Sequence, residues 1–255
     1  KGVAVTLDKV SNWMEAHRNT RFFVFARLRE LRIPMRLPRY GEGYIGKGRT
    51  PDPVDIYDTA LKSVDTQLGA FVSRLRDMPE LQHTVIAITS PYGFDFSEPD
   101  RGSWRRGGEP KRLLSEASLR VPVILSGPGI SSRNFTKLVA LEDLPMTLLM
   151  LVGGKFTHNA AGFNLFQHPG LSKVISMEGD PLAMSLRNPI WRFTWQSGKA
   201  PFAGVRESEE QILDFISIQD YQGKKARRDF LTEQSARVDE YRGQLMEYYN
   251  HWTKQ

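Results

Sequence analysis

Residues 83–93 read His-Thr-Val-Ile-Ala-Ile-Thr-Ser-Pro-Tyr-Gly, an apolar run that ends in a turn sequence. An unbroken run of this length is typical of a strand that is buried on both faces. Residues 21–26 and 121–125 form two similar runs, and the second is closed by Ser-Gly-Pro-Gly at 126–129. Strands of this kind predict a parallel sheet that is covered on both sides.

Apolar residues at helical spacing predict helices between these strands. The first is expected over residues 6–17 with Thr6 as its N-cap, and the second opens at Asp52-Pro53. A third is expected over residues 141–152, stopped by the glycines at 153 and 154. The alternation of strands and helices predicts an α/β domain, whose chemistry lies in the loops after the strands.

The character of the sequence changes after about residue 170. Shorter, more amphipathic strands are predicted at 172–176, 191–195 and 211–216, followed by a terminal helix over 226–252. We therefore predict an α/β domain over residues 1–170 and a small antiparallel α+β subdomain with a terminal helix over residues 171–255.

Composition limits the function only loosely. The 255 residues carry a net charge of +6 and are 40% hydrophobic and 25% charged, which is ordinary for a globular chain. The positive charge is compatible with nucleic acid, anionic lipid or acidic glycan without selecting among them. The absence of cysteine excludes disulfides and thiolate metal sites from this chain. The longest apolar run, residues 144–152, is far too short to cross a bilayer.

Five motifs follow one another along the chain. They are Tyr57, Asp65 and Gly69 on the second helix; Ser-Pro-Tyr-Gly at 90–93; Lys111 and Glu116 before Arg-Val-Pro at 120–122; Asp143-Leu with Thr147-Leu-Leu; and Gly-Phe-Asn-Leu at 162–165. In this order they resemble the C-terminal half of sulfatases, in the alkaline phosphatase superfamily. The resemblance covers nearly the whole chain and implies an alkaline-phosphatase-like, mainly parallel sheet that this chain supplies only in part.

The resemblance also implies what lies elsewhere. Sulfatases carry their nucleophile, a formylglycine in a Cys/Ser-x-Pro-x-Arg motif, in the N-terminal half with the first metal carboxylates. Nothing in this sequence matches that half. Half of a parallel sheet would leave an open edge and an uncovered face, which favours association. We therefore expect a partner that completes the sheet, either an N-terminal half or a second protein chain.

The turn at residues 90–93 is where the family binds calcium through oxygen ligands. The family motif there is Ser-Asp-His-Gly. Pro91 takes the place of the Asp ligand and has no side-chain oxygen, while Tyr92 takes the adjacent ligand position with a phenol, which is a poor metal ligand. Arg32 replaces the His that contacts sulfate in the family. Of the matched functional positions only Lys111 is retained, so Lys111 and Arg32 are the possible anion contacts.

We therefore predict a sulfatase-like pseudoenzyme without a metal cofactor, with a structural or interaction role in a larger assembly. One alternative is that nearby carboxylates replace the calcium ligands: Asp95, Glu98 and Asp100. In that case the chain belongs to a sulfuric- or phosphoric-ester hydrolase or transferase, completed by the missing half. Relatives are mostly exported, so a periplasmic, extracellular or lumenal location is expected.

A second alternative is a binding module for anionic glycan or lipid. The candidate contacts form a basic run after the turn, with Trp104 among them: Arg101, Arg105, Arg106, Lys111 and Arg112. Such a run would suit sulfate or phosphate groups. The alternative interpretation of these residues is a charged loop that faces water. No nucleic acid partner is expected.

Overall fold

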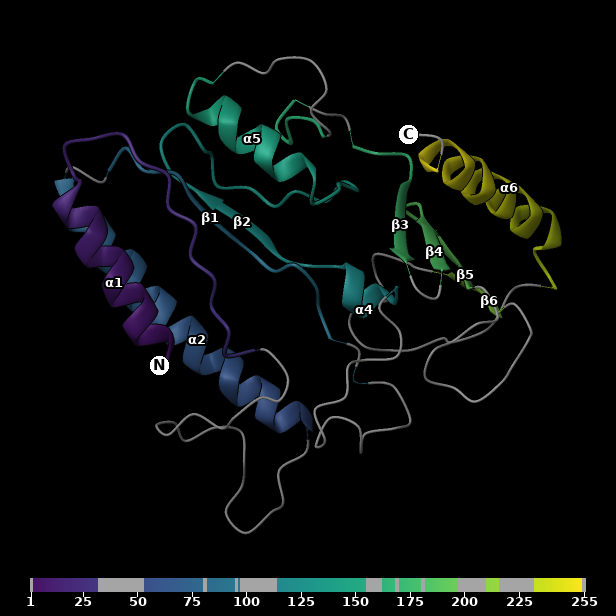
Figure 1. The fold of residues 1–255 in the computed structure, drawn as a ribbon, viewed down its shortest axis with the longest axis horizontal. Coiled ribbons are helices and arrows are strands. Elements are labelled where there is room, and N and C mark those ends of the chain that lie inside the picture. The colour runs from purple at the N-terminus through teal and green to yellow at the C-terminus, as the bar shows by residue number, and fades with distance from the viewer. Residues whose placement is uncertain are drawn as a thin grey trace, which may run out of the picture. The chain divides into compact units, whose positions relative to one another are not determined.

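The computed structural model describes residues 2–31, 53–79, 82–94, 96, 114–154, 162–167, 170–179, 182–196, 210–215 and 232–253 (Figure 1). The chain divides into two compact units, Lys1–Ser131 and Ser132–Gln255. This boundary lies earlier than residue 170, where the composition changes. The predicted division of the sulfatase-like domain from its subdomain at that point stays a prediction.

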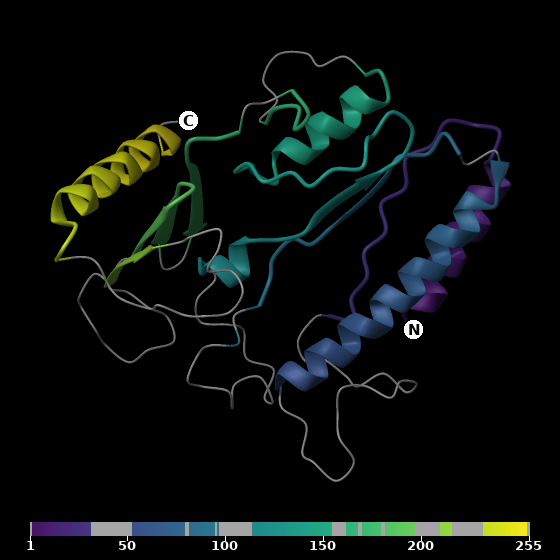
Figure 2. The ribbon, with the colours of Figure 1, turned by 180° about the vertical axis from the view of Figure 1, so that it is seen from behind.

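Two helices pack side by side in the first unit (Figures 1 and 2). Helix α1 covers Val3–Ala16 and helix α2 covers Pro53–Arg76. Their apolar faces form one buried cluster: Val3, Leu7, Met14, Val64, Phe71 and Leu75. The prediction of both helices is confirmed. The first begins earlier than predicted, because the amide of Thr6 already donates a hydrogen bond to the carbonyl of Gly2 (3.3 Å).

The segment after α1 departs from the prediction. Residues 21–29 do not form a strand, and Phe23 and Phe25 are each 80% exposed. The alternate residues Phe22 and Val24 pack against the α1–α2 cluster. The prediction of a strand buried on both faces is therefore wrong, since only one face of the segment has a neighbour in the described part of the chain.

Strands β1 (Ile86–Thr89) and β2 (Val123–Ser126) form a two-stranded sheet in the first unit. Both strands were predicted, but their pairing is antiparallel, with Ile86 opposite Ser126 and Thr89 opposite Val123. The predicted parallel pairing is wrong here because an apolar run reports burial and carries no information on strand direction. A one-turn helix, α4 (Glu116–Leu119), precedes β2.

The second unit begins with helix α5, Asp143–Leu151, as predicted. Gly153 follows it with a positive φ of 77°, the left-handed backbone that a residue with a side chain rarely adopts. The chain then enters a four-stranded antiparallel sheet in the order β3-β4-β5-β6. These strands are Val174–Gly179, Leu182–Arg187, Trp191–Gln196 and Glu210–Phe215.

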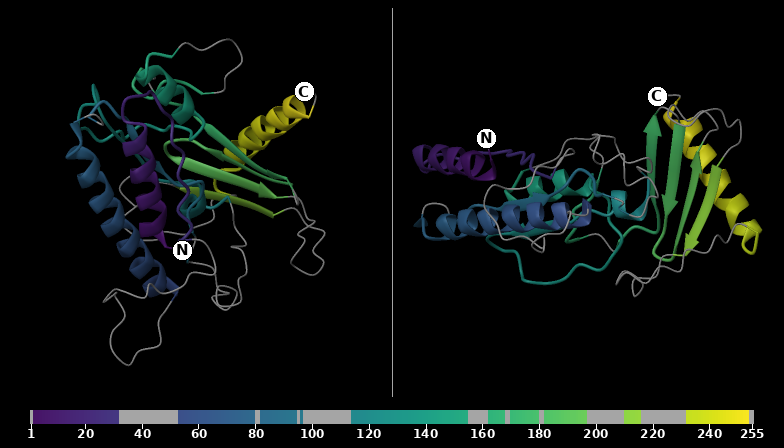
Figure 3. Two further views of the ribbon diagram at one scale, coloured as in Figure 1. Left: turned by 60° about the vertical axis from the view of Figure 1, so that its left-hand side comes forward. Right: turned by 90° about the horizontal axis from the view of Figure 1, so that it is seen from below.

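Helix α6, Ser235–Trp252, lies across one face of this sheet (Figure 3). The core between them contains Met184, Leu186 and Phe193 from the sheet and Tyr241 and Leu245 from the helix. The predicted antiparallel strands and terminal helix are thus present in the second unit. Strand β4 was missed, and the helix begins later than predicted. Within the residues described, no helix is both long and apolar enough to span a membrane.

Candidate functional site

The turn after β1 is fixed by its backbone. The amide of Gly93 donates a hydrogen bond to the carbonyl oxygen of Ser118 (2.8 Å), and the hydroxyl of Ser90 donates to the carbonyl oxygen of Tyr92 (2.6 Å). A Cβ atom on Gly93 would overlap the carbonyl oxygen of Ala117. The backbones of the turn and of α4 therefore approach so closely that residue 93 has to be glycine.

Helix α4, against which the turn rests, is capped by a buried serine pair. Ser115 is the N-cap, and its Oγ accepts a hydrogen bond from the amide of Ser118 (3.2 Å). The same Oγ donates to Oγ of Ser118 (3.0 Å). Both residues are buried, Ser118 almost completely. A helix of one turn is unstable by itself, so this cap and the contact with Gly93 hold it in place.

Aromatic rings gather beside the turn. The ring of Tyr57, on α2, lies edge-on to Phe94 (centroids 5.6 Å apart) and to Phe96 (5.1 Å). Tyr92 is also edge-on to Phe94, at 5.7 Å. These distances and angles are the ones that aromatic pairs prefer. We call Tyr57, Tyr92, Phe94 and Phe96 the aromatic cluster; it ties the turn to α2.

The side chains at this turn do not fit a calcium ion. Calcium requires six or more oxygen ligands at short range. Pro91 supplies none, and the ring of Tyr92 packs against Phe94. In the described part of the chain, no three side chains of His, Cys, Asp or Glu come close enough together to hold a metal.

Outside the described residues lie Arg32, Arg101, Arg105, Arg106, Lys111 and Arg112, together with Asp95, Glu98 and Asp100. Their roles stay predictions. Pro91 and Tyr92 do lie at the carboxyl end of β1, as the sequence predicted.

In the second unit, the sequence motifs contain Asp143 and Thr147 but did not predict the hydrogen bonds that these residues make. The carboxylate of Asp143, at the start of α5, is buried and accepts hydrogen bonds from the amides of Ala140 (3.0 Å) and Phe163 (2.8 Å). Thr147 Oγ1 accepts one from the amide of Leu165 (2.9 Å). Two family motifs, at 143–149 and 162–165, are thereby joined. The sequence shows only that two polar residues stand in an apolar helix, and it does not give the amides that they bind.

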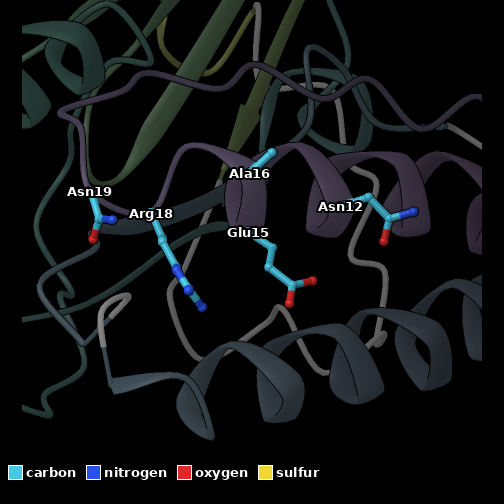
Figure 4. A pocket seen from close by; sticks show the side chains of 5 residues that line it. All are labelled: Asn12, Glu15, Ala16, Arg18 and Asn19. Atoms are coloured by element: carbon cyan, nitrogen blue, oxygen red, sulfur yellow. The ribbon is translucent and has the colours of Figure 1, made fainter.

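A hollow of about 530 Å³ lies at the C-terminal end of α1. It is lined by Asn12, Glu15, Ala16, Arg18 and Asn19, and Figure 4 shows the Glu15 and Arg18 side chains pointing to the same side. None of these was a predicted site residue. The lining mixes one acid, one base and two amides without a nucleophile, so it does not indicate a reaction.

Comparison with known proteins agrees with the motifs. The family model for Sulfatase matches residues 4–154. The chain therefore belongs to the sulfatase family.

Curated relatives include arylsulfatase K of Danio rerio, 30% identical over 143 residues, which are 56% of this chain and 24% of that protein. N-acetylglucosamine-6-sulfatase of Capra hircus is 33% identical over 136 residues, which are 52% of this chain and 20% of that protein. The chain thus spans about a quarter or less of the length of the curated relatives it matches.

Solved structures show the same fold. The putative sulfatase yidJ of Bacteroides fragilis matches with a TM-score of 0.68 and 15% identity, over 98% of this chain and 58% of that one. An alkaline phosphatase superfamily protein of Vibrio parahaemolyticus matches with a TM-score of 0.60 and 15% identity, over 85% of this chain and 50% of that one. At this identity the likeness concerns the fold alone.

Proposed function

We propose that this chain is the C-terminal part of a sulfatase-family domain that does not hydrolyse sulfate esters and that has a structural or interaction role. The observation that carries the proposal is the turn after β1. Pro91 and Tyr92 stand there in place of the ligand pair of the Ser-Asp-His-Gly motif, and the Tyr92 ring lies against Phe94 at 5.7 Å. A proline and a packed phenol cannot replace a carboxylate and an imidazole as metal ligands.

The chemistry of sulfate ester cleavage explains why the loss of these two metal ligands matters. The sulfuryl group that is transferred carries negative charge, and a divalent cation bound at the turn would offset that charge. Arg32 and Lys111 would attract an anion, but neither is a proton donor or acceptor of the kind that a His provides near neutral pH. The retained Lys111 and the Arg32 that replaces the His both support binding of an anion more than turnover. The basic residues at 101–112 support the same reading, with sulfated or acidic glycan or anionic lipid as ligand.

A second candidate function is sulfuric ester hydrolysis, with the nucleophile and most metal ligands in residues outside this chain. It is favoured by the relatives, which are named arylsulfatase K and N-acetylglucosamine-6-sulfatase. It requires that Asp95, Glu98 or Asp100 replace the carboxylate missing at Pro91. For either function, an exported location is proposed from the family.

The two candidates are separated by assaying the natural full-length protein on 4-methylumbelliferyl sulfate with added calcium. We expect no turnover above that of heat-inactivated protein. The double variant Pro91→Asp, Tyr92→His restores the family motif, and Pro91→Ala, Tyr92→Phe is its matched control. Turnover by the unmodified protein that disappears with EDTA would overturn the proposal in favour of the hydrolase.

A further inference from the structure

The segment between β2 and α5 contains the triplet Asn134-Phe135-Thr136. It is the only Asn-x-Ser/Thr triplet with a middle residue other than proline among the 255 residues of the sequence. This triplet is the acceptor motif for N-linked glycosylation of exported proteins. Because so short a motif also arises by chance, the surroundings of Asn134 have to show whether a glycan fits there.

The side chains on either side of Asn134 are held together by one cation. The guanidinium of Arg133 lies over the ring of Phe166, at 5.2 Å from the centroid, and over the ring of Phe135, at 5.9 Å. Such distances are those of cation–π contacts. Residues 133 and 135 therefore lie on the same side of the backbone, and Asn134, which stands between them, takes no part in this packing.

Both polar groups of the motif are open to solvent. Asn134 and Thr136 are exposed, and neither makes a hydrogen bond in the described part of the chain. Attachment of a glycan replaces one amide hydrogen of the Asn134 side chain by a sugar. It would therefore break no contact and displace no packed side chain.

The loop that carries the motif has a defined position in the second unit. The carbonyl oxygen of Leu138 accepts a hydrogen bond from the amide of Leu171 (2.8 Å), and Arg133 is held on Phe166. The acceptor side chain thus lies on a surface loop that is fixed on both sides of the motif. A bulky, solvated glycan is tolerated in such a place, because it extends into water.

We propose that Asn134 accepts an N-linked glycan when the chain is exported through the secretory pathway of a eukaryotic cell, and that this side of the loop stays open to solvent in the complete protein. In the reaction, Nδ2 of Asn134 forms a bond to the anomeric carbon of the first sugar of a lipid-linked oligosaccharide. The bond from that carbon to the lipid pyrophosphate breaks, the pyrophosphate leaves, and the amide proton passes to a base of the transferase.

A glycan on Asn134 is incompatible with a protein surface packed against this residue. The inference therefore assigns this side of the loop to the outer surface of the protein. It goes beyond the proposed function and rests on the exported location, and it holds whether or not the complete domain hydrolyses sulfate esters.

The test uses the natural full-length polypeptide, secreted from a mammalian cell line behind a cleavable leader. Peptide N-glycosidase in water labelled with heavy oxygen releases the glycan and converts its asparagine to labelled aspartate. Cleavage after glutamate then gives the peptide of residues 117–142, in which Asn134 is the only asparagine. We expect most copies of this peptide from the secreted protein to carry the label.

A matched pair of variants at Thr136 provides the control. Thr136→Ala removes the hydroxyl that the motif requires and should abolish the label, whereas Thr136→Ser keeps the hydroxyl and should retain most of it. Because the residue is exposed and makes no hydrogen bond in the described part of the chain, both variants should have a Tm within about 2 °C of the unmodified protein.

Unlabelled Asn134 in the secreted protein would overturn the proposal. So would a label that persists in Thr136→Ala, or a glycan found only on chains that the cell retains, since the last result would place Asn134 on a covered surface. None of these readouts depends on turnover, so failure here is distinguishable from failure of the proposed function.

Discussion

The carboxylate of Asp143 accepts the amide hydrogen of Phe163 at 2.8 Å, which links the start of α5 to a turn that follows it in the chain. The second oxygen of the same carboxylate accepts from Ala140 at 3.0 Å. Since the residue is buried, both bonds are made away from water and each is stronger than a neutral hydrogen bond.

Asp143→Ala should therefore destabilise the second unit. Two charge-assisted bonds are lost and two amides are left without a partner, at a cost of about 3 kcal/mol in the free energy of unfolding. Urea denaturation measures this change in the free energy of unfolding. Glu142→Ala is the control, because that exposed N-cap side chain makes no capping bond and its loss should change stability by less than about 0.5 kcal/mol. Equal effects for the two variants would contradict the prediction.

Thr147→Val should lower stability by about 1–3 kcal/mol at nearly constant volume. The Thr147 hydroxyl donates to the carbonyl of Asp143 (2.7 Å) and accepts from the amide of Leu165 (2.9 Å), so valine leaves a buried amide unsatisfied. Thr147→Ser keeps the hydroxyl and loses one methyl group, and should cost about 1 kcal/mol. The same denaturation experiment compares the stabilities of the two variants. If valine is tolerated better than serine, the hydroxyl has no such role.

Gly93→Ala and Gly69→Ala should act in opposite directions. At residue 93 the added methyl group overlaps the carbonyl oxygen of Ala117, so the turn has to move and Tm falls. At residue 69, inside α2, nothing lies within 4 Å of the added atom, and alanine should stabilise the helix by about 0.5–1 kcal/mol. Thermal unfolding measures both. A rise in Tm for both variants would mean that the turn and α4 are not in contact.

The edge-on pair Tyr57–Phe94 should be energetically coupled. A double-mutant cycle with Tyr57→Leu and Phe94→Leu is expected to give an interaction free energy of about 0.5–1.5 kcal/mol. A cycle with Tyr57→Leu and Trp13→Leu should give nearly zero, because the Trp13 ring contacts His17 and Phe22 instead. No coupling in the first cycle would show that the aromatic cluster does not hold the turn.

Helical periodicity predicted α1, α2 and α5 well because it depends on residues that are close in the sequence. Strand pairing depends on distant residues, and there the prediction failed twice. The apolar run at 21–26 has one uncovered face, and β1 and β2 run antiparallel. Strand β4 was missed because Ala183 and Ser185, which alternate with its core residues Met184 and Leu186, are themselves buried, so no clear pattern shows.

The candidate site was likewise predicted only in part from the sequence. The replacement of the family's Asp and His by Pro91 and Tyr92 was recognisable from the sequence because it falls inside a short motif next to a strand. The aromatic cluster was not, since Tyr57 reaches Phe94 only through the packing of α2 against the turn. The serine pair at 115 and 118 and the Asp143 bonds likewise depend on where backbone amides point, which no residue pattern specifies.

The path of the turn after β1 is set by Gly93, through its bond to Ser118 and its close approach to Ala117. Neither contact involves the side chains at positions 91 and 92. An exchange at those two positions keeps this part of the peptide frame and gives up only the edge-on contact of Tyr92 with Phe94 and the restricted φ of Pro91. Two substitutions separate the present sequence from the family motif. Such a frame is a natural starting point for directed evolution, since selection for ester cleavage could act on side chains without first rebuilding the loop.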